Sequence, residues 1–294
     1  MPDKSDHGFK HEFAVQPGIS VDFRKFSTKY TGSHFKKKKA EKHLVEDIES
    51  LSGAQELLWA SARYGVLIIF QAMDAAGKDG TIKHVMSGIN PQGVDVYSFK
   101  APTLNERMHH FLWRGIQKLP ARGRITIFNR SYYEEVLVVR IHQEFLAAQN
   151  LPEKKFDNEF WRLRYQEINN FERTITRNGT LVIKFFLHVS QEEQKKRFLE
   201  RLEDPDKMWK FSEDDFKERR HWKKYMQAYE QMLEGTSTEW APWYVIPADH
   251  KWFMRMAVAD IITSRIHEMN LSFPVVTKKQ RNHLMQIRRK LEGQ

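Results

Sequence analysis

The chain has 294 residues, with 48 Lys and Arg against 38 Asp and Glu, which gives a formal net charge of +10. Hydrophobic residues make up 40% of it, enough for a packed core, so disorder over most of the chain is excluded. There is no cysteine, which excludes disulfides, thiolate catalysis and cysteine-ligated zinc or iron–sulfur clusters.

The excess of positive charge indicates attraction to polyanions, whether nucleic acid, anionic lipid or a phosphorylated substrate. No apolar run approaches the ~20 residues that a membrane-spanning helix needs. Residues 1–6 lack the apolar core of a signal peptide. We therefore expect a cytoplasmic protein that does not enter a membrane.

The first part of the chain is polar and basic and ends in the four consecutive lysines 36–39. This composition predicts an extended basic arm over residues 1–40, followed by one domain over residues 41–294. Apolar residues at helical spacing then predict an amphipathic helix over 40–63.

Short runs rich in β-branched and aromatic residues alternate with helical segments through the rest of the chain. The predicted strands are 66–70, 94–99, 125–128, 181–187 and 243–246. The predicted helices between and after them are 78–87, 105–119, 156–177, 190–203, 213–234, 251–269 and 277–292. Such alternation indicates an α/β fold, with a parallel sheet covered by helices on both faces. The last helix is expected to dock on the body or on another subunit.

The segment from Gln71 to Thr81 follows the first strand and opens a helix, which is the context of a phosphate-binding loop. Small residues let backbone N–H groups approach phosphate oxygens, and the helix N-terminus adds partial positive charge. Lys78, in the first helical turn, opposes the helix dipole by ~0.3–1 kcal/mol unless an anion is bound.

The loop departs from the pattern G-x-x-x-x-G-K-[ST] at two positions, where Ala72 replaces the first Gly and Asp79 replaces the Ser or Thr. An ordinary strand-to-helix turn with a surface lysine is the alternative interpretation. The residues predicted to contact phosphate are Ala75, Ala76, Gly77, Lys78, Asp79, Gly80, Thr81 and Lys83.

Asp74 lies inside this loop, where a bare carboxylate would repel phosphate. A Mg²⁺ ion between carboxylate and phosphate, or a role in positioning the attacking phosphate, would account for it. A carboxylate that caps the following helix is the alternative.

At this loop, together with residues 128–134 (Phe-Asn-Arg-Ser-Tyr-Tyr-Glu), the chain resembles the polyphosphate kinase 2 family. The similarity extends through three further segments, 112–114, 209–212 and 241–248, and so covers roughly residues 20–270. The resemblance implies a P-loop kinase-like three-layer sandwich with a five-stranded parallel sheet and a helical lid at about residues 190–225.

The resemblance also implies roles for individual residues. Asn129 stands where many relatives have a metal-binding Asp, so Asp74 would be the charged metal ligand and Asn129 would offer a neutral oxygen. Arg130 would neutralise charge on the transferred phosphoryl group. Glu134 and Trp113 would contact the nucleotide. The alternatives are an Asn helix cap, a first-turn helix glutamate and a core tryptophan.

Arg197 and Arg201 lie one helical turn apart in the predicted lid. Like charges at that spacing destabilise a helix by ~0.2–0.5 kcal/mol, unless a polyanion lies across them. We expect both to bind polyphosphate, with Arg197 also taking part in catalysis. The basic surface continues through Lys207, Lys210, Arg219 and Arg220, for each of which a solvated surface charge is the alternative.

The resemblance, with which these residues agree, implies an enzyme that transfers phosphoryl groups, reversibly, between inorganic polyphosphate and nucleotides. Its acceptors would be AMP and ADP, or GMP and GDP, and its cofactor Mg²⁺, with Mn²⁺ as a substitute. We also expect it to form a dimer or tetramer with copies of itself. We do not expect it to bind nucleic acid or a membrane.

Two other functions are weighed. An ATP-dependent nucleoside monophosphate kinase would favour a complete G-x-x-x-x-G-K-[ST] loop, which this chain lacks. A non-catalytic, basic nucleic-acid-binding P-loop protein would favour exposed aromatic residues interleaved with the basic ones.

Overall fold

The computed structural model describes residues 9–32, 36–153 and 155–294. Five parallel strands form one sheet in the order β2-β3-β1-β4-β5. Their bounds are β1 Gly65–Gln71, β2 Val94–Ser98, β3 Ile125–Asn129, β4 Thr180–His188 and β5 Trp243–Pro247. The predicted five-stranded parallel sheet is therefore confirmed.

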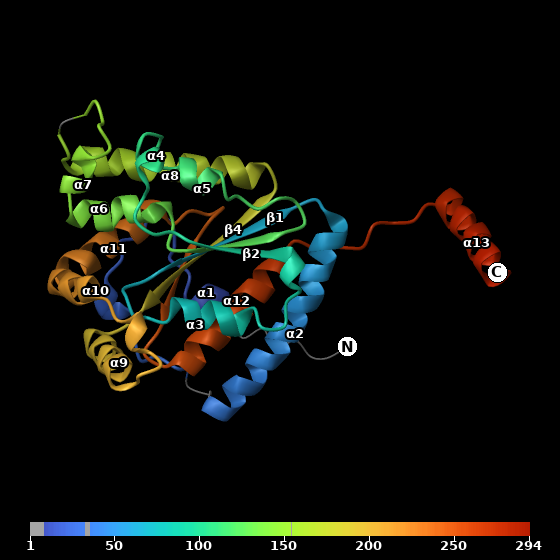
Figure 1. Ribbon diagram of the computed structural model, residues 1–294, viewed down its shortest axis with the longest axis horizontal. Coiled ribbons are helices and arrows are strands. Elements are labelled where there is room, and N and C mark those ends of the chain that lie inside the picture. Colours follow the sequence, from blue (N-terminus) through green and yellow to red (C-terminus); the bar gives the residue numbers. More distant parts are fainter. Residues whose placement is uncertain (1–8, 33–35, 154) are drawn as a thin grey trace.

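Helices cover both faces of this sheet and make three layers (Figure 1). One layer contains α12, which contacts both α2 and α3, and the other contains α8, which contacts β4 and α11. The main helices are α2 Lys37–Ser61, α3 Lys78–Val85, α8 Asn158–Arg177, α9 Gln191–Glu203, α11 Trp222–Thr236 and α12 Lys251–His267. Shorter helices are α1 Phe9–Glu12, α4 Leu104–Arg107, α5 Trp113–Ile116, α6 Val138–Ile141, α7 Glu144–Ala147 and α10 Glu213–Glu218.

The central strands are nearly continuous apolar runs because both of their faces are covered. Every residue of β1 is buried, and Ile68 pairs with Ile127 of β3 on one side and Ile183 of β4 on the other. At the end of the strand Phe70 pairs with Asn129. The register thus brings the segments that follow β1 and β3 side by side at the carboxyl edge of the sheet.

The N-terminal segment differs from the predicted extended arm. Phe9 and Phe13 are buried, and both rings pack edge-on against Phe253 of α12. Ala14 forms an antiparallel bridge with Tyr244, so this segment covers the open edge of β5. Lysines 37–39 begin α2 instead of ending an arm. Residues 1–8 and 33–35 of the predicted arm lie outside the described residues.

Two predicted helices are interrupted. The segment 105–119 forms the separate helices α4 and α5. After α4 the His109 N–H donates to the Glu106 carbonyl (3.3 Å), in place of the Asn105 carbonyl that a continuing helix would use. The segment 213–234 forms α10 and α11, separated by a short 3₁₀ turn at Arg219–His221. The predicted helix 40–63 starts three residues earlier, at Lys37.

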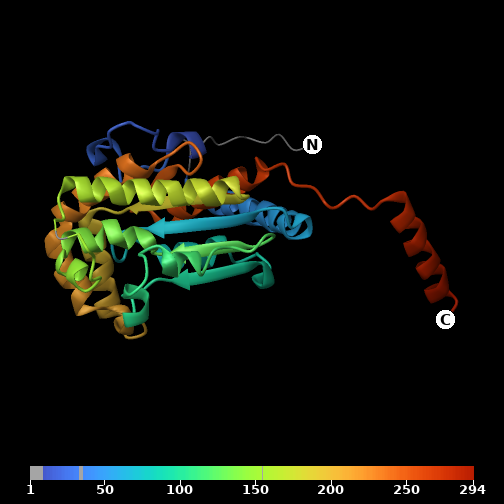
Figure 2. The same cartoon turned by 90° about the horizontal axis from the view of Figure 1, so that it is seen from above.

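The last helix, α13 (Lys278–Glu292), extends away from the rest of the molecule in both views (Figure 2). None of its residues is buried, and its apolar residues Leu284, Ile287 and Leu291 are exposed. The expectation that it docks on the body of the same chain is therefore wrong in this structure, and docking on another subunit stays a prediction. In the part of the chain that is described, no helix combines the length and apolarity needed to cross a bilayer.

Deleting residues 278–294 should change the thermal unfolding midpoint by no more than ~2 °C, because no buried side chain is lost. Thermal unfolding of the full and truncated chains measures this difference. A midpoint lowered by ~5 °C or more in the truncated chain would show that α13 stabilises the domain.

By contrast, Phe13→Ala should lower the free energy of unfolding by ~3–5 kcal/mol, because it removes a buried ring. Urea unfolding measures this loss.

Candidate active site

The loop between β1 and α3, residues 72–77, lies at the carboxyl end of the central strand. Ligands of parallel α/β sheets bind at this edge. The neighbouring strand β3 supplies Asn129 and Arg130, and on the other side β4 leads into α9, which carries Arg197. The sheet order therefore brings Asn129, Arg130 and Arg197 to the segment that carries Asp74 and Lys78.

The loop backbone turns sharply at Ala75 (φ 60°) and Gly77 (φ 109°). At Gly77 a side chain would face both a strained backbone and a steric conflict, because an added Cβ would lie 3.1 Å from the terminal methyl of Met254. Successive left- and right-handed residues turn N–H groups to the same side, which forms an anion-binding concavity. The predicted phosphate-binding loop therefore has a suitable backbone.

Lys78 is buried, and its ammonium lies back across its own loop. Nζ donates to the Ala72 carbonyl at 2.9 Å and lies 3.5 Å from the Met73 carbonyl. Burial is the main cause that lowers the pKa of Lys78, and the guanidinium of Arg130 is the second. Lys78 is thus not a surface lysine, and an anion between the two cations would stabilise both.

Arg130 directly follows β3 in a left-handed conformation (φ 61°), which costs a residue other than glycine ~1–3 kcal/mol. Its Nη2 donates to Asp74 Oδ1 at 2.5 Å. The pKa of Arg130 is raised, first by the nearby Glu134 carboxylate and also by Asp74. The guanidinium is therefore held between two carboxylates at the mouth of the loop.

Asn129 donates from its side-chain nitrogen to Asp79 Oδ1 at 2.6 Å, so its oxygen is the atom it can offer to a cation. It does not cap the following 3₁₀ helix, η3 (Tyr132–Val136), because the Ser131 hydroxyl does so by accepting from the Tyr133 N–H. The helix-cap alternative for Asn129 is therefore wrong.

Glu134 lies within η3 and is half-buried. Gln71 reaches Glu134 when its side-chain amide is oriented so that both the nitrogen and the oxygen have hydrogen-bond partners. The nitrogen then donates to Glu134 at 2.9 Å, and the oxygen accepts from the Ser131 hydroxyl at 3.1 Å. Glu134 also raises the pKa of Arg130, so it is one of the residues that stabilise the charged guanidinium. Contact with a nucleotide stays a prediction.

Arg197 is buried, and all five of its N–H groups are used. They donate, over 2.6–3.1 Å, to the carbonyls of Ala75, Ala76, Ala248 and Asp249 and to the Glu193 carboxylate. The guanidinium thus grips the carbonyl side of the loop and joins it to the end of β5. This geometry favours a loop-supporting role over the predicted direct contact with phosphate.

The predicted lid contains α9, α10 and the turns between them. Arg201 is half-buried and its Nη1 lies 3.4 Å from the Lys210 carbonyl. Arg219 is an anchor, because it donates to Gln191 and Gln194 at 2.8 Å each. Lys207 pairs with Asp204 on the surface. The basic residues of the lid therefore do not form one continuous face.

Asp215, on α10 of the lid, is a residue that the sequence reasoning missed. Burial, followed by the nearby Asp74 carboxylate, raises its pKa to about 6, and Arg130, Arg201 and Lys78 act in the opposite direction. It therefore lies close enough to the loop for its charge to interact with those of Asp74 and Lys78. In the sequence it belongs to an acidic helix start, and no spacing distinguishes it from its exposed neighbours.

Two cations of α12 were also missed. Arg255 approaches the first turn of α3, because its Nη2 lies 3.7 Å from the place of a Cβ on Gly80. The pKa values of Lys251 and Arg255 are lowered, first by burial and then by Arg197. Both residues lie in the first part of α12, the helix that follows β5 at the same edge of the sheet. Only the sheet topology places them there.

The remaining predicted site residues are Trp113, Lys83 and Thr81. Trp113, on α5, is half-buried, and its ring stacks on that of His109 with centroids 4.2 Å apart. Lys83 is exposed on α3, and Thr81 is buried and donates to the Gly77 carbonyl at 3.0 Å. Within the described residues, no group of three or more His, Asp or Glu is arranged to hold a metal ion.

The chain is similar to known proteins over most of its length. Residues 34–274 match the model of the family described as Polyphosphate kinase 2 (PPK2). The ADP-polyphosphate phosphotransferase of Rhodopseudomonas palustris is 48% identical over 281 residues, which cover 95% of this chain and 97% of that protein. The AMP/ADP-polyphosphate phosphotransferase of Meiothermus ruber is 41% identical, over 90% of this chain and 95% of that protein.

Among solved structures, that of Polyphosphate Kinase 2 from Arthrobacter aurescens superposes with a TM-score of 0.85 and 36% identity. The match covers 95% of this chain and 96% of that one. Since the similarity spans the sheet and the lid alike, it extends well beyond the loop.

The raised pKa of Asp215 predicts a pH-dependent gain on its removal. A carboxyl whose pKa is raised on folding favours the protonated form, so its contribution to stability falls as pH rises from about 4 to about 6. Asp215→Asn should therefore stabilise the metal-free protein by ~1 kcal/mol above pH 6, after allowance for partial exposure, and far less at pH 4. Urea unfolding across this range measures the difference.

The neighbouring variant Asp214→Asn, at an exposed carboxylate, is the matched control and should show no such trend. An Asp215→Asn gain that is the same at pH 4 and pH 7.5 would show that the carboxylate does not face the loop.

Proposed function

The chain belongs to the polyphosphate kinase 2 family, and on this basis we propose that it transfers phosphoryl groups between inorganic polyphosphate and AMP or ADP. The products in the synthetic direction are ADP and ATP. The observation that carries the proposal is the loop after β1, where the buried ammonium of Lys78 and the guanidinium of Arg130 converge. This arrangement is built for a phosphate group, in a chain that matches two named phosphotransferases over almost its full length.

Phosphoryl transfer asks the protein to align donor and acceptor and to neutralise the equatorial oxygens of the moving group. In the proposed mechanism the loop N–H groups and Lys78 bind the phosphate to be transferred. Arg130 approaches it from the β3 side. No general base is required, because the attacking terminal phosphate is already an anion. The buried position of Lys78 strengthens its interaction with the phosphate.

Asp74 and Asn129 are the proposed metal ligands. A carboxylate and an amide oxygen fit Mg²⁺, which prefers a few oxygen ligands from protein and takes the others from water and substrate phosphates. Mn²⁺ accepts the same donors. A bound ion would offset the negative charge of the phosphates and account for a carboxylate inside a phosphate-binding loop. The pairing of Asp74 with Arg130 fits this role, because incoming phosphate would compete for the guanidinium and release the carboxylate.

Polyphosphate would extend from the loop along the cations around it. Lys251 and Arg255 of α12 and Arg201 of the lid lie near the loop, and Lys83 extends this basic surface along α3. Arg197 would contribute indirectly, since it holds the loop carbonyls. Such a track would bind a polyanion partly through release of counterions.

The direct test supplies the protein with Mg²⁺, polyphosphate and, in separate reactions, AMP, ADP, GMP or GDP, and resolves the products by chromatography. We expect ADP and ATP to form, and Lys78→Ala to lower turnover at least ~100-fold, about 2.7 kcal/mol of barrier. Lys290→Ala removes a lysine from the separate helix α13 and is the control, which should keep full activity. Products that form only with ATP in place of polyphosphate would instead indicate a nucleoside monophosphate kinase.

The proposed track predicts a salt response that depends on chain length. Raising the salt concentration should weaken binding of long polyphosphate more steeply than that of short oligophosphates, since a long chain releases more counterions. The KM for each chain length, measured from ~50 to ~200 mM salt, gives the slopes. Equal slopes for long and short chains would contradict an extended track.

A further inference from the structure

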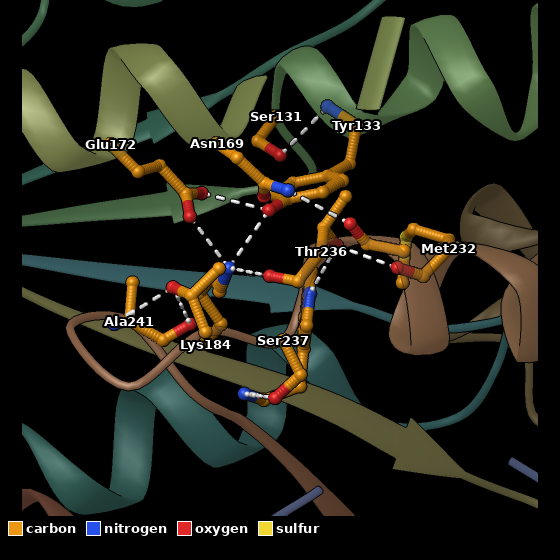
Figure 3. A network of polar contacts seen from close by, with 12 residues as sticks. Ser131, Tyr133, Asn169, Glu172, Lys184, Met232, Thr236, Ser237 and Ala241 are labelled. Atoms are coloured by element: carbon orange, nitrogen blue, oxygen red, sulfur yellow. Dashed lines mark hydrogen bonds and ion pairs between the residues drawn. The ribbon is translucent and has the colours of Figure 1, made fainter. Parts of the chain in front are cut away.

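A fully buried ion pair lies beneath the segment that carries Arg130. Glu172 of α8 and Lys184 of β4 are 2.6 Å apart, and neither side chain is exposed at all (0% each). The ammonium also donates to the Tyr133 hydroxyl at 2.9 Å and to the Thr236 carbonyl at 2.8 Å (Figure 3). The other carboxylate oxygen accepts from the hydroxyls of Tyr132 and Tyr133, at 2.9 and 2.8 Å.

Stability alone is a weak explanation for such a pair. Removing two charges from water costs several kcal/mol per ion, and well-packed apolar replacements are often as stable or more so. Here the compensation is complete, because the three ammonium hydrogens have three acceptors and both carboxylate oxygens are used. Burial lowers the pKa of Lys184 despite the carboxylate beside it and raises that of both tyrosines, which stay donors.

The two tyrosines connect this pair to the strained residue of the active site. Tyr132 follows Arg130 after a single residue. The hydroxyls of Tyr132 and Tyr133 both donate to Glu172 and so fix the start of η3 to this carboxylate. The backbone of Arg130 is also held from the sheet, because its N–H donates to the Phe70 carbonyl at the end of β1, at 3.0 Å. The left-handed backbone of Arg130 is thus clamped between the end of β1 and the buried pair.

The ammonium connects the same segment to the helix that returns from the lid. Thr236 is the last residue of α11, which begins where the lid ends. Tyr229, on the same helix, is close enough to Arg130 and Glu134 for their charges to influence its hydroxyl. One pair of charges therefore fixes the start of η3, which follows Arg130, and the C-terminal end of α11 relative to each other.

We propose that Glu172 and Lys184 are positioning residues, which hold Arg130 in its strained conformation and in register with α11, the helix that follows the lid, for phosphoryl transfer. This inference rests on the proposed function and extends it to two residues that touch no substrate. It predicts that loss of the pair acts on the chemical step through Arg130, whereas a role in stability alone would leave turnover per folded molecule unchanged.

The test is a double-mutant cycle between the pair and Arg130. The combined variant Glu172→Gln/Lys184→Met removes both charges at similar volume, and so avoids leaving one charge buried and unpaired. We expect kcat to fall at least ~10-fold, with KM for polyphosphate changed less than ~3-fold. In an Arg130→Ala background the same two changes should lower kcat by less than ~2-fold further, because their effect is transmitted through the missing side chain.

Two further variants complete the design. Ile175→Ala, three residues along α8, destabilises the core but removes no charge or hydrogen bond of the pair, and should leave kcat per folded molecule within ~2-fold. Tyr133→Phe keeps both charges and removes only the hydroxyl between them, so it remains informative if the combined variant does not fold, and it should lower kcat at least ~3-fold.

The inference is overturned if the combined variant or Tyr133→Phe keeps wild-type kcat, or if the loss is equally large without Arg130. These outcomes are distinct from a failure of the proposed function, in which the wild-type protein itself would form no nucleotide product from polyphosphate.

Discussion

Two cations held close together in a largely buried loop are the constraint on which the rest of the site depends. The Lys78 ammonium loses hydration and lies near the Arg130 guanidinium, and both effects disfavour its charged form. The protein partly offsets this with Asp74 and Glu134 and with the carbonyl of Ala72. A phosphate group bound between the two cations, as proposed, would add to this compensation.

Support for these cations comes from two layers of polar contacts with different tasks. Arg197 uses every donor it has to hold the carbonyl side of the loop, which leaves the N–H side for a ligand. Beneath Arg130, the buried pair of Glu172 and Lys184 fixes the two tyrosines of η3. An arginine in a left-handed conformation needs such support, because its backbone strain would otherwise relax and move the guanidinium.

The two ends of the described chain contrast in their dependence on the domain. The N-terminal segment places Phe9 and Phe13 against Phe253 and covers the edge of β5, so it belongs to the core despite its polar composition. The helix α13 has an apolar stripe at helical spacing but no buried residue. A helix of that length is marginal in water by itself, and the docking of its stripe on another subunit stays a prediction.

From the sequence alone follow the five strands, most helices, and the loop with its lysine and aspartate, since each depends on periodicity or on neighbours along the chain. The family resemblance added Asn129 and Arg130, which the parallel register of β1 and β3 then brought beside the loop. Only the tertiary structure decided that Arg197 donates to loop carbonyls, that Asp215 lies near the charges of the loop and that Glu172 pairs with Lys184. A charged side chain has the same local signature on a surface as in a buried network. What distinguishes the two is which remote segments supply its hydrogen-bond partners, and that depends on how the sheet and helices assemble.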